Sequence, residues 1–129
     1  MLSNLKKILY VEDDEDIAVV ATMTLEEIGG FEIKHALSGS LALELLASYD
    51  PDLILMDVMM PGMDGVETYK EIRNLEKWES IPVIFMTAKA QTHEQKTYMD
   101  LGAIGVVVKP FDPMILCKTI KGFWDKHTV

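Results

Sequence analysis

Cysteine, basic residues and long apolar runs are all scarce in this chain of 129 residues. The single cysteine, Cys117, cannot form a disulfide within the chain, so we expect a buried thiol and no need for an oxidising compartment. No apolar run approaches the ~20 residues that cross a bilayer, and the first run is too short for the core of a signal peptide. We therefore expect neither membrane insertion nor secretion, and predict a cytoplasmic location.

Positive charge is outweighed, because 12 lysine and arginine residues face 21 aspartate and glutamate residues, for a formal net charge of −9. A field of this sign repels the phosphate backbone of nucleic acids and attracts cations or basic partners. Flexible linkers, low-complexity segments and internal repeats are also missing. The sequence thus predicts one domain over residues 1–129 that does not bind DNA or RNA directly.

Short apolar runs recur along the chain, each bounded by turn or polar residues. Four are continuous, as expected for buried strands: ILYV from Ile8, LILM from Leu53, IPVIFM from Ile81 and IGVVV from Ile104. The segment FEIKHAL, from Phe31, alternates apolar and polar residues over its first half, which is typical of a strand at a sheet edge. These patterns predict five strands.

Helical patterns lie between the predicted strands. Apolar residues at helical spacing predict a buried stripe on the first helix, formed by Ile17, Val20, Ala21, Leu25 and Ile28. Asp64 followed by Glu67, and Thr92 followed by Gln95, resemble the capping boxes that begin helices. Strands that alternate with helices in this way predict an α/β fold, in which a parallel sheet is covered on both faces.

Chemically active side chains come directly after the predicted strands. The first strand ends at Glu12 and Asp13, the third at Asp57, the fourth at Thr87 and the fifth at Lys109. Ligand sites of open parallel sheets lie beyond the carboxyl ends of the strands, so we expect these side chains to share a pocket. Clustered carboxylates suit Mg²⁺, which would offset their mutual repulsion. Asp57 could then attack phosphorus and form an acyl phosphate.

Four motifs carry a resemblance to a known family: ILYVEDD, PDLILMDVMMPGMDG, VIFMTAKA and GAIGVVVKPF. In this order and spacing they resemble the receiver domain of two-component response regulators, the family of the single-domain chemotaxis regulator. The resemblance implies a doubly wound (βα)5 flavodoxin-like fold, with a five-stranded parallel sheet of order 2-1-3-4-5 and helices on both faces. It also implies a regulatory phosphoacceptor, which catalyses only its own phosphorylation and slow autodephosphorylation.

The resemblance also implies roles for three residues in phosphoryl transfer. Asp57 would be the phosphoacceptor, and Thr87 and Lys109 would contact the phosphoryl group. The donor would be a sensor histidine kinase or a histidine phosphotransfer protein, and the sequence does not identify the downstream target. By the same resemblance, the peptide bond between Lys109 and Pro110 is expected to be cis.

A magnesium site is the second implication of the resemblance. Asp13, Asp57 and the main-chain carbonyl of Met59 would bind Mg²⁺, and Glu12 would hold a metal-bound water. In the family, the positions of Met59 and Lys89 flank the phosphoryl group and influence how water reaches it. Because methionine offers no hydrogen bond to orient an attacking water, we expect a comparatively long-lived acyl phosphate.

One position departs from the family pattern. Many receivers carry an aromatic residue three positions before the lysine, where this chain has Val106, whose short and stiff side chain cannot sweep out the volume of a tyrosine ring. We expect the signal to pass through Thr87 into the fourth helix, around residues 93–101. It would be read on the surface of that helix, the fifth strand and the fifth helix. Lys118 and Lys121 offer contacts there for an acidic partner or a phosphorylation-dependent second copy.

Other functions fit these residues less well. A flavin or nucleotide site needs a glycine- or hydroxyl-rich loop after the first strand, where this chain has EDDED. A calcium loop counted from Asp13 has Ala18 in place of glycine and Thr24 in place of glutamate. Phosphatases of the haloacid dehalogenase type carry a second aspartate two residues after the nucleophile, where this chain has Met59. A degenerate receiver that only binds partners would not need the site residues, which are all present.

The remaining polar residues have structural explanations. Three further acids are expected to cap the first helix and to occupy its first turn without binding metal: Asp14, Glu15 and Asp16. The histidines show no ligand spacing and are expected to be ordinary surface or hydrogen-bonded side chains: His35, His93 and His127.

Overall fold

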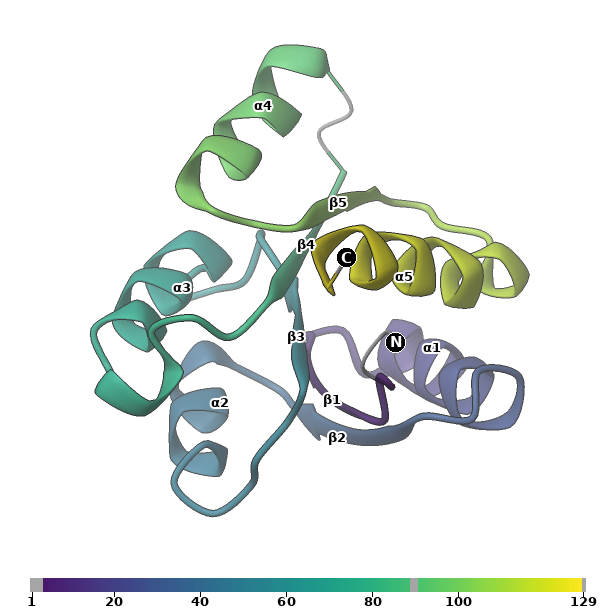
Figure 1. The fold of residues 1–129 in the computed structure, drawn as a ribbon, viewed down its shortest axis with the longest axis horizontal. Coiled ribbons are helices and arrows are strands. Elements are labelled where there is room, and N and C mark those ends of the chain that lie inside the picture. The colour runs from purple at the N-terminus through teal and green to yellow at the C-terminus, as the bar shows by residue number, and fades with distance from the viewer. Residues whose placement is uncertain (1–3, 89–90, 129) are drawn as a thin grey trace.

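The computed structural model describes residues 4–88 and 91–128, which form a five-stranded sheet between two layers of helices (Figure 1). The strands are β1 (Lys7–Val11), β2 (Glu32–Ala36), β3 (Leu53–Asp57), β4 (Val83–Thr87) and β5 (Gly105–Val108). The helices are α1 (Glu15–Glu27), α2 (Gly39–Leu45), α3 (Gly65–Arg73), α4 (Thr92–Leu101) and α5 (Pro113–Thr128), with a short 3-10 turn η1 (Glu76–Trp78). The strands are parallel in the order β2-β1-β3-β4-β5, which confirms the expected doubly wound fold.

Alternation along the strands divides the core between the two faces of the sheet. On β1, Ile8 and Tyr10 pack in one cluster with α1 and α5, whereas Leu9 and Val11 pack in the other with α2, α3 and α4. We call these sides the α1/α5 face and the α2/α3/α4 face, and Figure 1 shows the helices on the two sides of the sheet. The central strands β3 and β4 are buried throughout because helices cover both faces. Cys117 is buried on the α1/α5 face, as expected.

Strand β2 lies at the edge of the sheet, as its alternating sequence predicted. Glu32 and Lys34 are exposed, whereas Ala36 is buried. Within the described residues, no helix has the length and apolar character needed to cross a membrane.

The buried stripe of α1 differs from the predicted one at two positions. Val20 is 52% and Ile28 50% exposed, so the expectation that they face the core is wrong. The residues that do face the sheet are Ala18, Ala21 and Leu25, which follow one another at intervals of three and four positions. The small alanine side chains allow the helix to lie close to the sheet, and the larger β-branched residues turn outward.

Side-chain caps begin α1 and α3 as the sequence predicted. The Asp64 carboxylate accepts a hydrogen bond from Glu67 N at 2.8 Å, and the Glu67 carboxylate accepts one from Asp64 N at 3.3 Å, which completes the capping box of α3. At α1, the Asp14 carboxylate accepts from the main-chain nitrogens of Asp16 and Ile17. The acids after β1 therefore fix the start of α1, as expected.

Helix α4 is attached differently from the other helices. The predicted capping box of Thr92 and Gln95 is wrong, because the N-cap is Gln91 and it makes no side-chain capping bond. Tyr98 is the buried residue of this helix, and the Tyr69 hydroxyl donates to the carbonyl oxygen of Leu101 at 2.7 Å. An amphipathic helix with one buried side chain and no side-chain cap is held mainly by those contacts.

The loop after β3 folds back onto the end of that strand. Gly65 N donates to the carbonyl oxygen of Val58 at 2.9 Å, which places the start of α3 against the strand end. A Cβ atom on Gly65 would contact the main-chain oxygen of Asp57 and lie 2.8 Å from the Cα of Val58. Glycine is therefore needed where α3 begins against the strand end that carries Asp57.

Replacing Gly65 with alanine tests this close approach. We expect Gly65→Ala to lower the free energy of unfolding by about 1–3 kcal/mol, because the added methyl group must displace main-chain atoms of β3. Urea denaturation measures the change, with Gly122→Ala as the matched control. A Cβ at Gly122 has open space on helix α5, so that variant should gain about 0.5–1 kcal/mol. Equal effects of the two substitutions would contradict the expectation.

Candidate acidic phosphoacceptor site

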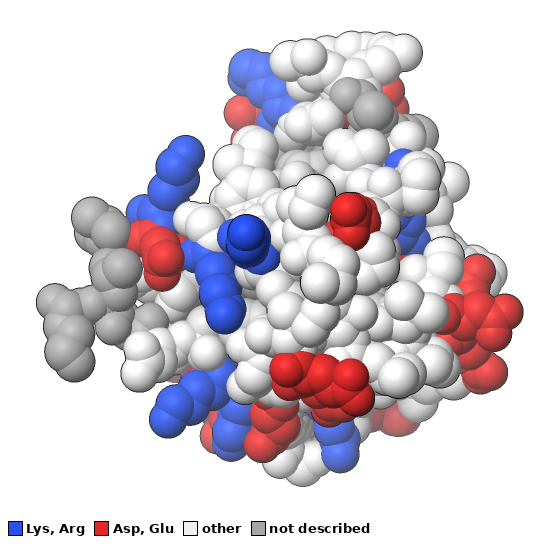
Figure 2. Space-filling view, turned by 90° about the vertical axis from the view of Figure 1, so that its right-hand side faces the viewer, with Lys and Arg blue, Asp and Glu red and all other residues white. Residues whose placement is uncertain are grey.

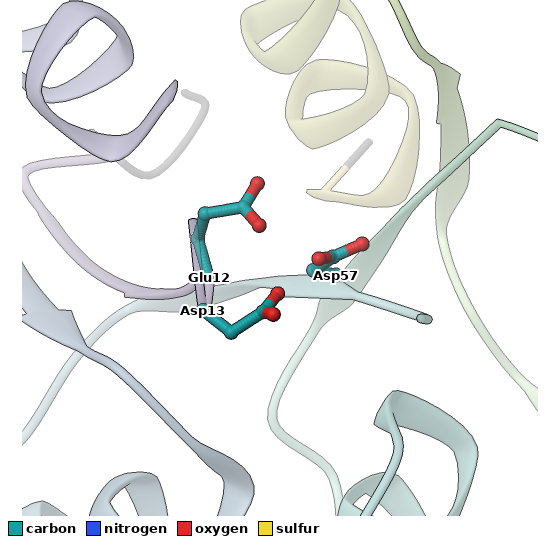
Figure 3. A group of neighbouring side chains, drawn as sticks. All are labelled: Glu12, Asp13 and Asp57. Carbon is teal, nitrogen blue, oxygen red and sulfur yellow. The ribbon is translucent and has the colours of Figure 1, made fainter. Parts of the chain in front are cut away.

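Three carboxylates converge at the carboxyl ends of the central strands. Glu12 and Asp13 follow β1, and Asp57 ends β3 (Figure 3). One ligand oxygen from each side chain lies within 4.8 Å of the others. Glu12 is 0% and Asp57 2% exposed, whereas Asp13 faces solvent. The cluster thus joins two buried acids to one that a cation can reach from outside.

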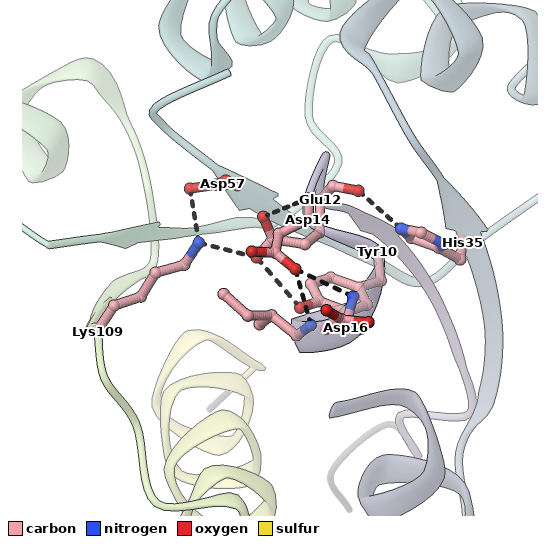
Figure 4. Close-up of polar contacts among 8 residues, drawn as sticks. Tyr10, Glu12, Asp14, Asp16, His35, Asp57 and Lys109 are labelled. Carbon is pink, nitrogen blue, oxygen red and sulfur yellow. Dashed lines mark hydrogen bonds and ion pairs between the residues drawn. The ribbon is translucent and has the colours of Figure 1, made fainter. Parts of the chain in front are cut away.

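Lys109 bridges the two buried acids. Its Nζ lies 2.8 Å from Oε1 of Glu12 and 3.1 Å from Oδ1 of Asp57 (Figure 4). The main chain brings it there, since Lys109 N donates to the carbonyl oxygen of Thr87 at 2.8 Å. The peptide bond between Lys109 and Pro110 is cis, as the family resemblance predicted. One ammonium group therefore faces two carboxylates, and the site keeps a net negative charge.

This charge imbalance perturbs the titration of all three groups. Burial, with the proximity of Glu12, raises the pKa of Asp57 to about 7. Burial acts in the same direction on Glu12, but hydrogen bonds with Asp57 and Lys109 outweigh it and lower the pKa of Glu12. Burial would lower the pKa of Lys109, yet Glu12 and Asp57 raise it. Because Lys109 lies closer to Glu12 than to Asp57, Asp57 is the carboxylate of this pair whose pKa is raised.

The acids line a hollow of about 240 Å³. Its lining consists of Glu12, Asp13, Asp14, Ile17, Asp57, Met59, Ala88 and Lys109. Met59 is 61% exposed, so its side chain leaves the hollow open to water. Lys89, which the sequence placed beside the phosphoryl group, lies outside the described residues. The structure thus brings together the predicted acids, the predicted lysine and Met59.

Thr87 stands apart from this lining. It is fully buried at the end of β4, directly after Met86, whose Cα pairs with that of Asp57. Met86 packs on the α1/α5 face and Phe85 on the other, so alternation places Thr87 with Phe85 on the α2/α3/α4 face. The Thr87 side chain therefore points to the side of the sheet that carries α4, at a strand end that neighbours Asp57.

Two contacts of Glu12 were not predicted from the sequence. The Tyr10 hydroxyl donates to Oε1 of Glu12 at 3.4 Å, and Nε2 of His35 lies 2.8 Å from the Glu12 carbonyl oxygen (Figure 4). A signal existed for the first contact, since residues two apart on a strand point to the same face. The second depends on the register of β1 against β2, which pairs Tyr10 with His35 and which local sequence does not reveal.

Comparison with known proteins identifies the family. The family model described as the response regulator receiver domain matches residues 8–121. The chain belongs to this family. Receiver domains of response regulators are regulatory and act as phosphoacceptors in two-component signalling. Receiver domains typically bind Mg²⁺ at an acidic pocket, and this chain has a cluster of three carboxylates, Glu12, Asp13 and Asp57.

Solved structures agree with this assignment. The chemotaxis response regulator CheY4 of Vibrio cholerae is 31% identical, with a TM-score of 0.85 over 93% of this chain and 99% of that one. The receiver domain of a Francisella response regulator is 28% identical, with a TM-score of 0.83 over 96% of this chain and 99% of that one. The receiver domain thus shares its whole fold with both.

A curated relative shares only part of its length with this chain. A probable cyclic di-GMP phosphodiesterase of Vibrio cholerae serotype O1 is 40% identical over 103 residues, which are 80% of this chain and 23% of that protein. Because the chain spans so small a share of that relative, the activity in the relative's name is not assigned to this receiver domain.

The raised pKa of Asp57 predicts a pH-dependent effect of removing its charge. Between the ordinary pKa of an aspartate and about 7, the folded protein binds more protons than the unfolded chain, so stability falls as the pH rises through that interval. We expect Asp57→Asn, without Mg²⁺, to raise the free energy of unfolding by about 1–3 kcal/mol at pH 8 and by less at pH 5.

Chemical denaturation at the two pH values measures this difference. Asp50→Asn is the control, because Asp50 is an exposed carboxylate paired with Lys77 and should change stability little at either pH. A gain for Asp57→Asn that is equal at pH 5 and pH 8 would show that the charge of Asp57 is not its cause.

Proposed function

We propose that this receiver domain, over residues 1–129, is a phosphoacceptor switch of a two-component phosphorelay in which Asp57 takes the phosphoryl group in the presence of Mg²⁺. The observation that carries the proposal is the position of Asp57, which is buried and shares Lys109 with Glu12, yet lines an open hollow with Asp13. The role is regulatory, and we place it in the cytoplasm, where histidine kinases present their phosphorylated histidine.

The donor set fits Mg²⁺, which prefers oxygen ligands and binds through one or two carboxylates while it keeps several waters. Asp13, Asp57 and the main-chain carbonyl of Met59 would hold the ion, and Glu12 would hold one of its waters. When bound, the ion supplies positive charge that compensates the carboxylates and the phosphoryl oxygens. Two buried carboxylates share only one ammonium group, so the positive charge of the ion would compensate the remaining negative charge.

The residues around Asp57 support an in-line transfer. An ionised oxygen of Asp57 attacks phosphorus while the phosphorus–nitrogen bond to the donor histidine breaks and the imidazole leaves. Lys109 already contacts Asp57, so its ammonium group can move to a phosphoryl oxygen over a short distance. The Thr87 hydroxyl would donate to another phosphoryl oxygen. Because Thr87 does not line the acidic hollow, its side chain would have to move toward the phosphoryl group.

An apolar hollow next to the acids supports a protein as the phosphoryl donor. It measures about 490 Å³ and is lined by Asp16, Ile17, Val20, Ala88, Lys109, Pro110, Phe111 and Pro113. Ile17, Ala88 and Lys109 also line the acidic hollow, so the two are contiguous. Figure 2 looks onto α1 and α5, where much of the surface is uncharged. A sensor histidine kinase or a histidine phosphotransfer protein would cover this region while its histidine reaches Asp57.

The packing behind Thr87 supports a readout through α4. Phe85, two residues before Thr87 on β4, lies with its ring centroid 5.4 Å from that of Tyr98 on α4. Val106 packs on the same side of the sheet. A movement of Thr87 would thus act on an aromatic contact with α4, although the usual aromatic position holds valine. The downstream partner would bind the surface of α4, β5 and α5, with Lys118 exposed for an acidic target or a second copy.

Phosphorylation by a small-molecule donor tests the phosphoacceptor. Incubation with acetyl phosphate and Mg²⁺ should add one phosphoryl group to the chain, detected by intact-protein mass spectrometry, and Asp57→Asn should abolish it because the attacking carboxylate is gone. The Asp50→Asn variant, which changes an exposed carboxylate that pairs with Lys77 and is not among the clustered acids, should be phosphorylated normally. Modification that persists in Asp57→Asn would refute the assignment.

Removing the exposed acid tests the metal site. We expect Asp13→Ala to weaken Mg²⁺ binding by about tenfold or more in calorimetric titration, because the site loses one of its few carboxylate ligands. Phosphorylation by acetyl phosphate should fall with it. Asp16→Ala is the control, since Asp16 is an exposed acid in the first turn of α1 that is not among the clustered carboxylates. An unchanged Mg²⁺ titration in Asp13→Ala would exclude Asp13 as a ligand.

Amide hydrogen exchange tests the readout surface. With beryllofluoride as a phosphoryl mimic, we expect changed protection in α4 and β5, within residues 91–106, because Thr87 is linked to α4 through Phe85 and Tyr98. The same measurement on Asp57→Asn is the control and should show no change. Changes confined to α1 and the loops that carry the acids would rule out this surface.

A further inference from the structure

Glu12 is held from two sides by residues that the family resemblance does not mention. Its carboxylate accepts from the Tyr10 hydroxyl, and its main-chain carbonyl oxygen lies against His35. Because a carbonyl oxygen only accepts, Nε2 of His35 carries the proton and donates it. Both side chains are drawn beside Glu12 in Figure 4.

The sheet places these three residues together. Tyr10 and Glu12 are two residues apart and share the α1/α5 face, and the Cα of Tyr10 pairs with that of His35 across β1 and β2. The Tyr10 and His35 rings lie 5.6 Å apart between centroids. Glu12 N also donates to the carbonyl oxygen of Ala36 at 3.0 Å, so the residue is tied to β2 by its main chain.

Tyr10 contacts the same carboxylate oxygen as Lys109. Lys109 lies 2.8 Å from Oε1 of Glu12, and the Tyr10 hydroxyl lies 3.4 Å from it, which is long for a hydroxyl donor. The Tyr10 phenol carries an O–H donor at neutral pH and can donate to this oxygen. Lys109 thus makes the short contact with Oε1 of Glu12, and the Tyr10 hydroxyl lies close enough to become its main donor if the lysine moves away.

Phosphorylation would change this balance. When Lys109 turns toward a phosphoryl oxygen, the fully buried Glu12 carboxylate loses its direct cation. A buried carboxylate without a partner is strongly unfavourable, so the cost of moving the lysine depends on the donors that remain. The protein donors are the Tyr10 hydroxyl and the main-chain nitrogen of Asp14, which is 3.4 Å from Oε2, and they would act beside the Mg²⁺-bound water that Glu12 is proposed to hold.

We propose that Tyr10 and His35 are positioning residues for phosphorylation, which hold the side chain and the main chain of Glu12 in place while Lys109 leaves it for the phosphoryl group. The inference rests on the proposed function of Asp57 and adds two residues to it. Neither residue contacts the phosphoryl group, and both act through Glu12.

The variant Tyr10→Phe isolates the hydroxyl, because the ring stays in the core. Mg²⁺ affinity alone and beryllofluoride affinity at saturating Mg²⁺ are measured by calorimetry. Lys109 still holds Glu12 in the first state, so the Mg²⁺ affinity should change by less than about twofold, whereas beryllofluoride affinity should fall about threefold to tenfold. In this variant, a loss of both affinities together would contradict the role proposed for the Tyr10 hydroxyl.

Tyr49→Phe is the matched control. Tyr49 is half-buried, and its hydroxyl donates to a carboxylate oxygen of Glu32 at 3.1 Å, outside the acidic site. This variant loses one hydroxyl bond to a carboxylate but should leave both affinities unchanged. Thermal melting of both variants reports their folded state.

His35 supplies a second and independent arm. His35→Leu removes the donor to the Glu12 carbonyl oxygen and should weaken both Mg²⁺ and beryllofluoride binding about threefold to tenfold, because the main chain that carries Glu12 and Asp13 is no longer fixed. His35→Gln provides an amide donor and should restore both affinities to within about twofold of the wild type. This arm stands even where Tyr10→Phe lowers the melting temperature.

The outcomes separate the two hypotheses. A wild-type protein that binds no beryllofluoride would overturn the proposed function together with this inference. Normal wild-type binding, with affinities unchanged in Tyr10→Phe and His35→Leu, would overturn the inference alone. The selective loss in Tyr10→Phe and the rescue by His35→Gln would establish both residues as positioning residues.

Discussion

The repulsion between the buried carboxylates of Glu12 and Asp57 is the constraint on which the site depends. Two like charges at this distance in a poorly solvated setting cannot both persist without compensation, and Lys109 supplies only one positive charge. The deficit would favour a divalent cation at the site, and together with burial it raises the pKa of Asp57 to about 7. Without a cation, the repulsion between the acids therefore lowers the stability of the folded protein, and a cation that compensates it would be bound favourably.

The fold supplies the geometry that creates this repulsion. Parallel strands end at a common edge, so Glu12, Asp57 and Lys109 meet although they are far apart in the sequence. Gly65 lets α3 begin against the end of β3, and the Asp14 cap fixes where α1 begins. The close approach of the carboxylates thus follows from common local features: the ends of parallel strands, a glycine at a close contact, and a helix cap.

Much of this arrangement could be predicted from the sequence, because strand ends and capping boxes are local signals. Asp57 and Lys109 were identified from the apolar runs before them, and the Asp64 box has the spacing of a cap. The outward orientation of Val20 was not predictable, since the choice between neighbouring helical stripes depends on how closely α1 approaches the sheet. The partnership of His35 with Glu12 was hidden as well, because it follows from the register of two strands.

The failed prediction at Thr92 has a similar physical origin. A threonine three residues before a glutamine matches a capping box, but the helix already includes Thr92 and starts after Gln91. Helix boundaries depend on where tertiary contacts fix the chain, and here Tyr98 and the Leu101 carbonyl provide those contacts. The capping pattern therefore predicted the start of α4 less well than the start of α3, where the capping box forms and Gly65 N also donates to the carbonyl oxygen of Val58.

The division of the core by the sheet has a consequence for how substitutions act on the two sides. By alternation along their strands, the side chains of Glu12, Asp57 and Lys109 lie on the α1/α5 face. Phe85 and Tyr98 pack on the α2/α3/α4 face. Substitutions distant from one another, with no shared partners, have nearly independent effects. Substitutions in the aromatic packing beneath α4 would therefore act on the proposed readout without contacting Glu12, Asp57 or Lys109, and Val106 packs on that same side of the sheet.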